Sequence, residues 1–400
     1  MAAISFCIPV ITLIFGYVFM LSIGGSVMAG KSLGAGSIAA ACDIFTRVIS
    51  VQLLSAVLVA ALGLLGVEWL LPLLGTNALV GDLAGEYLRI ILLLMPIGMV
   101  AVALVYFVQA DGRPMLANIA LILGAVSNVC LDWLFIAKLD LGISGAALAT
   151  GSSYTLTLLV LIPHFFSNKT KLSFRFGNGN WRDVGRAAFN GVSEFVNEAS
   201  VGITALMFNW VMMLRFGVDG VAAYAVINYL FYMGMMANFA LGDALQPLVS
   251  YCFGARKPKR IRAFVEVALV SAVLIGVVLV SCLLLIPQLI IAIFIDASEV
   301  TVIAIAEQFI QWFWPTFIFM GANVCFSAYC TAMHKPMVST GIALLRSLIL
   351  PALGLLLLPV LMNDKGVYMA LSLAEGITFC VVLLLVGRYL PERLLVKPGK

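Results

Sequence analysis

Acidic and amide side chains inside apolar segments are the residues of this chain that could do chemistry. Asp132 follows Asn128 by four residues in an apolar stretch, and positions four apart share one face of a helix. An ionisable group in such a segment costs roughly 3 kcal/mol on insertion scales and usually marks an ion pathway or a paired site. We expect Asn128 and Asp132 either to hold a proton or a small cation, or to join neighbouring helices through hydrogen bonds.

A second polar stripe runs along the segment that begins near residue 190. Glu194, Glu198 and Asn209 recur there with small residues at spacings of three and four, which places them on one helix face. Such a face should contact protein or water rather than lipid. The two glutamates could bind a cation or relay protons, but a solvated helix end explains them equally well.

Two further acidic positions interrupt apolar segments. Asp243 and Gln246, just before Pro247, could line the floor of a cavity or replace the backbone contacts that the proline removes. Glu375 lies in the last apolar segment with no partner that the sequence identifies, and Arg346 falls inside the segment before it. An isolated buried carboxylate is a functional candidate.

Methionine and aromatic residues gather around these acids between positions 207 and 236, and they include Tyr224 with Asn228 one turn later. Such side chains adapt to varied apolar shapes, and ring faces attract cations, which suits a binding site for amphiphilic cations. The same residues also pack ordinary helices, and the sequence leaves both interpretations open.

Motifs of nucleotide-binding proteins and hydrolytic enzymes do not occur in the sequence. It has no Gly-x-x-x-x-Gly-Lys-Ser/Thr phosphate loop, no Gly-x-Ser-x-Gly elbow and no His-Glu-x-x-His helix. The eight cysteines form no Cys-x-x-Cys pair, and the two histidines end separate apolar stretches, so we expect neither a zinc site nor a disulfide framework. We therefore expect no enzyme activity, no ATP and no cofactor.

The composition requires a membrane. Of the 400 residues, 63% are hydrophobic and 10% charged, against roughly 45–50% and about 25% in soluble domains, and the mean hydropathy is +1.12. No alternating short segments of the kind that build a membrane barrel occur. The fold class is therefore an all-α polytopic membrane protein. Its net charge of +4 reports topology rather than a nucleic-acid partner.

Windows of about 20 residues predict eleven membrane helices. They cover approximately 3–28, 44–72, 87–109, 115–137, 143–166, 188–214, 220–251, 263–294, 302–328, 337–361 and 367–388.

Basic residues cluster in every second connection, as the positive-inside rule requires. One set holds 18 Lys and Arg residues and includes the runs at 169–186 and 256–262 and the C-terminal tail, whereas the other set holds four. We expect the set with 18 basic residues to be cytoplasmic, and the C-terminus belongs to this set. The same alternation places Met1 outside, although no leader segment precedes it.

The two halves of the chain repeat. Gly34-Ala35 corresponds to Gly254-Ala255 at an offset of 220, Arg113-Pro114-Met115 to Lys335-Pro336-Met337 at 222, and Gly142-Ile143 to Gly366-Val367 at 224. This predicts two six-helix units in a transporter-type arrangement. The counterpart of the helix at 188–214 would precede Met1, so we expect the first unit to lack its first helix. The expected domains are an N-terminal lobe at 1–166, a basic linker at 167–187, a C-terminal lobe at 188–390 and a tail at 391–400.

These motifs, in this order and position, resemble the multidrug and toxic compound extrusion (MATE) family of secondary transporters, over essentially the whole chain. The segments that carry the resemblance are Gly24-Gly25-Ser26, Ser32-Leu33-Gly34-Ala35-Gly36, Ala110-Asp111-Gly112-Arg113-Pro114, Asn128-Val129-Cys130-Leu131-Asp132, Gly142-Ile143-Ser144-Gly145-Ala146-Ala147, Gln246-Pro247-Leu248-Val249-Ser250-Tyr251 and Gly254-Ala255.

The resemblance implies two lobes around a central cavity, alternating access and export driven by a proton or sodium gradient. It also implies a cation-coupling site at Asn128 and Asp132, with a hydroxyl from the next helix that Thr150 matches. The repeat aligns Asn128 and Asp132 with Leu350 and Gly354, so we expect coupling in one lobe. The residues assigned to the substrate cavity are Glu194, Glu198, Asn209, Tyr224, Asn228, Asp243 and Gln246.

The sequence thus predicts an antiporter of the inner (plasma) membrane that exports amphiphilic, cationic drugs or toxic compounds with H⁺ or Na⁺ as the coupling ion. We expect a monomer whose partners are these small molecules and the lipid bilayer. One alternative is a flippase for lipid-linked precursors or polysaccharides, which should line its cavity with basic residues. Another is an inactive, truncated carrier.

Overall fold

The computed structural model describes residues 2–73, 78–167 and 170–395, and every regular element in these ranges is a helix. The basic residues Lys169, Lys397 and Lys400, assigned above to cytoplasmic segments, lie outside the described residues. The chain forms two compact units, Met1–Phe195 (unit 1) and Val196–Lys400 (unit 2). The division falls inside a helix, whereas the sequence placed the linker at 167–187.

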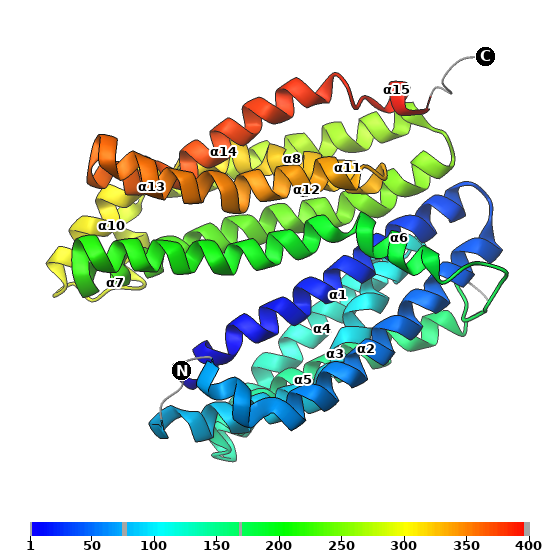
Figure 1. Ribbon diagram of the computed structural model, residues 1–400, viewed down its shortest axis with the longest axis horizontal. Helices are drawn as coiled ribbons and strands as arrows, with labels where there is room; N and C mark the ends of the chain where they lie inside the picture. Colours follow the sequence, from blue (N-terminus) through cyan, green and yellow to red (C-terminus); the bar gives the residue numbers. More distant parts are fainter. Residues whose placement is uncertain (1, 74–77, 168–169, 396–400) are drawn as a thin grey trace. The chain divides into compact units, whose positions relative to one another are not determined.

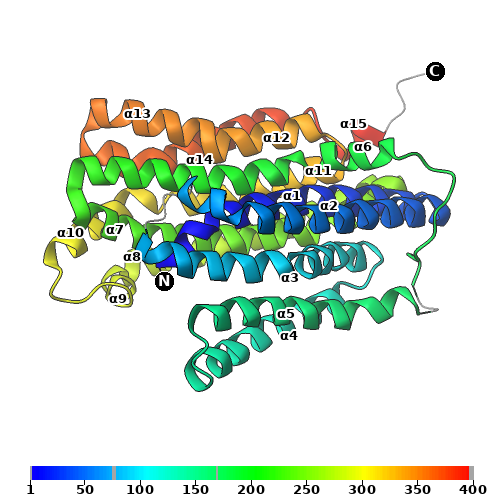
Figure 2. The ribbon, with the colours of Figure 1, turned by 60° about the horizontal axis from the view of Figure 1, so that its bottom comes forward.

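Unit 1 is built around one central helix, α3, which contacts α1, α2, α4 and α5 (Figures 1 and 2). Its elements are α1 (Ala2–Gly34), α2 (Ile38–Leu73), α3 (Ala78–Ala110), α4 (Pro114–Asp132), the π-helix η1 (Trp133–Lys138), α5 (Gly142–Phe165) and α6 (Arg182–Asn190). Helix α5 packs along α4, and the two approach closely at Gly124, where a side chain would meet the Thr157 hydroxyl. Small residues at such contacts let membrane helices pack without a hydrophobic driving force.

Unit 2 begins within the 63-residue helix α7 (Val192–Gly254), which is broken at Gly217 (φ 63°, ψ −150°). The elements that follow are α8 (Pro258–Leu285), α9 (Pro287–Ala292), α10 (Val300–Phe313), α11 (Thr316–Ala332), α12 (Pro336–Leu344), the π-helix η2 (Leu345–Ile349), α13 (Leu350–Met362), α14 (Asp364–Val386) and α15 (Pro391–Leu395).

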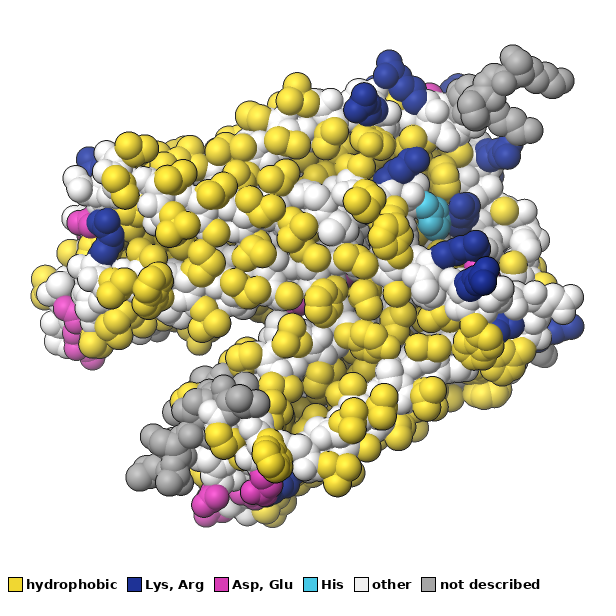
Figure 3. Space-filling model, in the orientation of Figure 1, with side chains coloured by type: hydrophobic (Ala, Val, Ile, Leu, Met, Phe, Trp, Pro, Cys, Tyr) yellow, Lys and Arg dark blue, Asp and Glu magenta, His cyan; other side chains and the backbone are white. Residues whose placement is uncertain are grey.

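Nine of the described helices are long and apolar enough to cross a membrane, and the pair α10 and α11, bent by 54°, makes a further span. The break at Gly217 divides the 63-residue helix α7 into two helices. Apolar side chains cover most of the middle of the long helices in each unit, and charged side chains gather toward helix ends (Figure 3). The predicted all-α membrane fold is confirmed.

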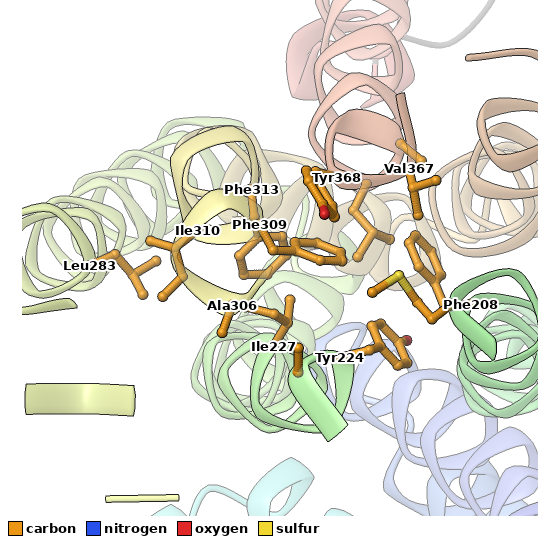
Figure 4. Packing of buried hydrophobic residues seen from close by; sticks show 14 of the residues in the cluster. Phe208, Tyr224, Ile227, Leu283, Ala306, Phe309, Ile310, Phe313, Val367 and Tyr368 are labelled. Carbon is orange, nitrogen blue, oxygen red and sulfur yellow. The ribbon is translucent and has the colours of Figure 1, made fainter. Parts of the chain in front are cut away.

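The core of unit 2 is aromatic (Figure 4). Phe208 and Tyr224, from the two halves of α7, stack with ring centroids 5.1 Å apart, and Phe309 of α10 lies 4.9 Å from the ring of Tyr368 of α14. Offset and tilted ring pairs of this kind add about 0.5–1.5 kcal/mol beyond area burial. The core thus ties the broken helix α7 to α10 and α14.

The internal repeat recurs in the backbone at helix ends. Gly36 and Arg256, paired by the offset of 220, both have positive φ (80° and 52°), and so do Gly112 and His334 (88° and 55°), paired by 222. Pro114 then begins α4 as Pro336 begins α12. A left-handed residue that ends one helix, followed by a proline in the first turn of the next, is a compact way to reverse the chain.

Residues 170–181, which we call the strap, are held on unit 1 by two buried carboxylates. Asp111, at the end of α3, accepts hydrogen bonds from the Thr170 hydroxyl (2.7 Å) and from the backbone amides of Lys171 (3.1 Å) and Leu172 (3.2 Å). Nε2 of His164 also lies 2.7 Å from an oxygen of the same carboxylate. Charge-assisted bonds to a buried carboxylate are among the stronger ones in proteins.

The second carboxylate is Asp43 of α2. It accepts hydrogen bonds from the Gly177 amide (2.6 Å) and from Nε of Arg47 (2.9 Å). Nη2 of Arg47 donates to the Gly177 carbonyl (3.3 Å). A side chain at Gly179 would collide with the Asp43 carboxylate, so the strap can approach α2 this closely only with glycine there. The strap is therefore a fixed part of unit 1.

This attachment predicts an engineered disulfide. The Cys42 sulfur lies 3.7 Å from the Ser173 hydroxyl oxygen, so Ser173→Cys should form a bridge to Cys42 on oxidation. Closing this long loop should raise the free energy of unfolding by about 2–4 kcal/mol. Mass spectrometry of peptides and thermal unfolding in detergent would measure both effects. Ser173→Cys combined with Cys42→Ala is the control. A bridge that forms only after denaturation would contradict the attached strap.

Candidate functional site

Asp132 is the last residue of α4, directly before the π-helix η1, and is half-buried. Its oxygen Oδ1 is buried and has no hydrogen-bond partner among the described residues. Tyr87, a buried residue of α3, lies within electrostatic range of the carboxylate. Buried polar atoms are nearly always hydrogen-bonded, so an exception calls for an explanation. A proton or a cation at this oxygen would provide one.

The structure places the other two predicted coupling residues on adjacent helices without joining them to Asp132. Asn128 lies one turn earlier on α4 and is half-buried, and the Thr150 hydroxyl of the adjacent helix α5 donates to the Ala146 carbonyl of its own helix (3.0 Å). Within the described ranges, no hydrogen bond links these three side chains. The site therefore has its oxygens on two packed helices, and the coupling role of these residues stays a prediction.

The predicted polar stripe falls on both sides of the boundary between the units, because Glu194 belongs to unit 1 and Glu198 to unit 2. Both are half-buried. Within unit 2, Glu198 and Asp243, on the two halves of α7, are close enough for their charges to interact, and Tyr232 is within electrostatic range of Glu198. Two neighbouring carboxylates repel each other and are stabilised by a cation.

The remaining residues assigned to the cavity have varied surroundings. Tyr224 is 3% exposed and packs in the aromatic core, with its hydroxyl 3.4 Å from Oδ1 of Asn228. Gln246 is buried, whereas Asn209 and Asn228 are half-buried. Their part in substrate binding stays a prediction.

A buried charged network in unit 2 was not predicted from the sequence. The Arg346 guanidinium, in η2, donates to Oε1 of Glu375 on α14 from Nε (3.1 Å) and Nη2 (2.8 Å). The Asn323 amide of α11 donates to Oε2 of Glu375 (2.7 Å) and to its backbone carbonyl (2.9 Å). All three residues are at most 4% exposed. Glu375 is therefore the counter-ion of the Arg346 guanidinium.

The one feature of the sequence that indicates this ion pair is the presence of opposite charges in two successive apolar segments. The sequence could not show that Arg346 and Glu375 meet, because the rotation of each helix about its axis decides which side chains face each other. The sequence gives no comparable sign for Asn323, an amide among apolar residues.

Known proteins agree with this architecture. The MatE family model matches residues 1–134 and 193–356. The chain belongs to the MatE family. This confirms the resemblance drawn from the motifs, and the family is one of membrane transporters.

The similar relatives include two staphylococcal proteins, both called multidrug export protein MepA. The protein from Staphylococcus aureus is 24% identical over 395 residues, which cover 96% of this chain and 85% of that protein. The protein from Staphylococcus saprophyticus is 23% identical over 393 residues, with the same shares covered.

Two solved structures show the same fold. A MOP superfamily transporter from Pyrococcus furiosus superposes with a TM-score of 0.90 at 20% identity, covering 98% of this chain and 88% of that one. The MATE transporter VcmN of Vibrio cholerae gives a TM-score of 0.88 at 22% identity, covering 98% and 90%.

The ion pair of this MatE-family chain predicts an asymmetric mutational response. Glu375→Gln should lower the free energy of unfolding by about 3–5 kcal/mol, because it leaves the Arg346 charge buried without a counter-ion. The double variant Arg346→Met/Glu375→Leu should recover most of this loss, since both charges leave together. Thermal unfolding in detergent micelles would measure the series.

Glu68→Gln is the matched control for this series. Glu68 pairs with Arg89 at 2.5 Å, but the two side chains are 75% and 51% exposed, so its loss should cost less than about 1 kcal/mol. A double variant as unstable as Glu375→Gln would contradict the account of Arg346 and Glu375 as a mutually neutralising pair.

Proposed function

We propose that this chain is a cation-coupled antiporter that exports amphiphilic, cationic small molecules across the inner (plasma) membrane. Its membership of the MatE family supports transport, and relatives named multidrug export proteins support the substrate class. The proposal includes a cytoplasmic C-terminus, a monomeric carrier, and no use of ATP or nucleic acid.

The observation that supports the coupling step is Oδ1 of Asp132, a buried oxygen that has no hydrogen-bond partner in the described ranges. A proton or sodium ion that binds this carboxylate removes a costly charge from an apolar bundle, and the lower cost of burial favours a different packing of the helices in unit 1. A sodium ion needs several oxygen ligands, which Asn128 and Thr150 could add, whereas a proton needs the carboxylate alone. Leu350 and Gly354 hold the corresponding positions of unit 2, so the coupling step belongs to unit 1.

The preference for cations follows from the acidic residues of unit 2. Glu198 and Asp243 interact through their charges, with the Tyr232 phenol nearby. In a medium of low dielectric, a cationic substrate relieves the repulsion between two carboxylates. An aromatic ring adds a cation–π contribution.

The alternative, a flippase for lipid-linked precursors, requires basic side chains that hold phosphate. Arg346 is buried inside a described membrane span, but Glu375 and the ring of Phe239, 5.9 Å from the guanidinium carbon, already surround its charge. An arginine neutralised in this way has little attraction left for an anionic lipid. The pair therefore gives no support to an anionic substrate.

Replacing the coupling carboxylate should abolish active export. In energised membrane vesicles, Asp132→Asn should remove gradient-driven efflux of ethidium while the protein remains folded and inserted. Comparing the efflux under a proton gradient alone with the efflux under a sodium gradient alone identifies the coupling ion. Asp140→Asn is the matched control, because Asp140 is exposed and has φ 53°, a conformation that asparagine adopts readily.

Efflux that persists unchanged in Asp132→Asn would contradict coupling at this carboxylate. No efflux of ethidium under either gradient, from wild-type protein shown to be folded, would favour the flippase or a carrier that does not transport.

The paired carboxylates predict a change in apparent affinity. Glu198→Gln/Asp243→Asn should raise the KM for ethidium by roughly tenfold, the equivalent of about 1.4 kcal/mol of lost attraction. Substrate-concentration series in the same vesicles would measure it. Asp219→Asn, an exposed position on the same helix, is the control. An unchanged KM would remove these residues from the substrate site.

A further inference from the structure

The strap and helix α6 expose large aromatic side chains. Phe174, Phe176, Trp181 and Phe189 are between 45% and 60% exposed. The ring of Phe45 lies 4.8 Å from Phe174, and the Arg47 guanidinium carbon lies 4.8 Å from the Trp181 ring. The inner part of these rings is therefore fixed on unit 1, and the outer part is presented to the surroundings.

Cationic side chains accompany these rings. Arg175 and Arg182 are exposed, and within the described residues no carboxylate pairs with either of them. The nearby carboxylates Asp43 and Asp111 are buried and bonded to the strap backbone, and Asp183 of α6 pairs with Arg186 (2.8 Å), so Arg175 and Arg182 keep their charge uncompensated. The strap therefore carries uncompensated positive charge beside exposed rings.

Helix α6 has one buried face and one exposed face. Val184, Ala187 and Asn190 are buried, and Ala187 lies against α1, where the close approach requires Gly24. Arg182 and Phe189 are exposed. A short helix that shows cations and an aromatic ring on its outer face is typical of a segment lying in the membrane interface.

We propose that the strap and α6 form a binding surface for anionic phospholipid headgroups at the cytoplasmic face of the membrane. Aromatic rings settle at the level of the headgroups, with their apolar body toward the acyl chains. Guanidinium groups bind phosphate oxygens in a forked geometry. A free phosphate ion would use the arginines but not the rings, which is why a lipid is the occupant that fits both.

Lipid contact at Trp181 tests the proposal in nanodiscs. The fluorescence of Trp181 is obtained as the difference in tryptophan emission between the wild type and Trp181→Phe. Phosphatidylglycerol brominated on its acyl chains should quench it more than brominated phosphatidylcholine at equal mole fraction. Each Lys or Arg near an anionic membrane surface strengthens the attraction to that surface roughly fivefold. Arg175→Gln/Arg182→Gln should therefore reduce the excess quenching to the level seen with phosphatidylcholine.

Lys259→Gln/Arg260→Gln is the control, because it removes two exposed cations from the first turn of α8. This pair should keep the excess quenching. About 0.5 M salt should weaken it, since the Debye length falls to a few ångströms.

Three results would overturn the proposal. One is equal quenching by the two lipids in the wild type, and another is equal loss of the excess in both pairs of variants. The third is removal of the excess by millimolar inorganic phosphate, which would make the surface a site for soluble anions. Because the readout is lipid contact, it is independent of ethidium efflux and of the proposed antiport.

Discussion

The cost of placing charge in an apolar environment governs this structure more than any other constraint. A bundle that is 63% hydrophobic can hold an ionised group only where a partner compensates the lost hydration. Asp43 has Arg47, Asp111 has strap amides and His164, and Glu375 has Arg346. Asp132 differs, because one of its carboxylate oxygens has no partner in the described part of the chain.

This difference separates the charges that are bonded within the fold from the one that we propose as the ion site. A carboxylate that is fully bonded in the folded state is expensive to protonate or to remove, so it stabilises one arrangement. A carboxylate with an unbonded oxygen is the better ion site, since binding there improves its environment without breaking another interaction. The internal repeat sharpens the contrast, because unit 2 has Leu350 and Gly354 at the corresponding positions and uses its buried acid, Glu375, for an ion pair.

Hydropathy was enough to predict the helices, and the resemblance of the motif segments was enough to predict the family. The bilayer leaves helices as the means of satisfying the backbone, so any long apolar segment must be one. The attachment of the strap to unit 1 could not be predicted in this way. The strap is bonded to Asp111 and Asp43 mainly through its own backbone amides, those of Lys171, Leu172 and Gly177, and backbone amides have no signature in the sequence. These bonds attach residues 170–181 of the expected linker to unit 1.

The intramembrane charges of Asp132 and Arg346 both lie at a π-helix. Asp132 immediately precedes the π-helix at Trp133–Lys138, and Arg346 lies inside the one at Leu345–Ile349. A π-turn contains an extra residue, which loosens the regular hydrogen bonding of the helix and rotates the side chains that follow. Such a turn gives a charged side chain a direction that a regular helix would not allow. It also gives the backbone a place to adjust when the charge is neutralised. Local irregularity of this kind is expensive in a membrane, and it accompanies both the Asp132 carboxylate and the buried pair of Arg346 and Glu375.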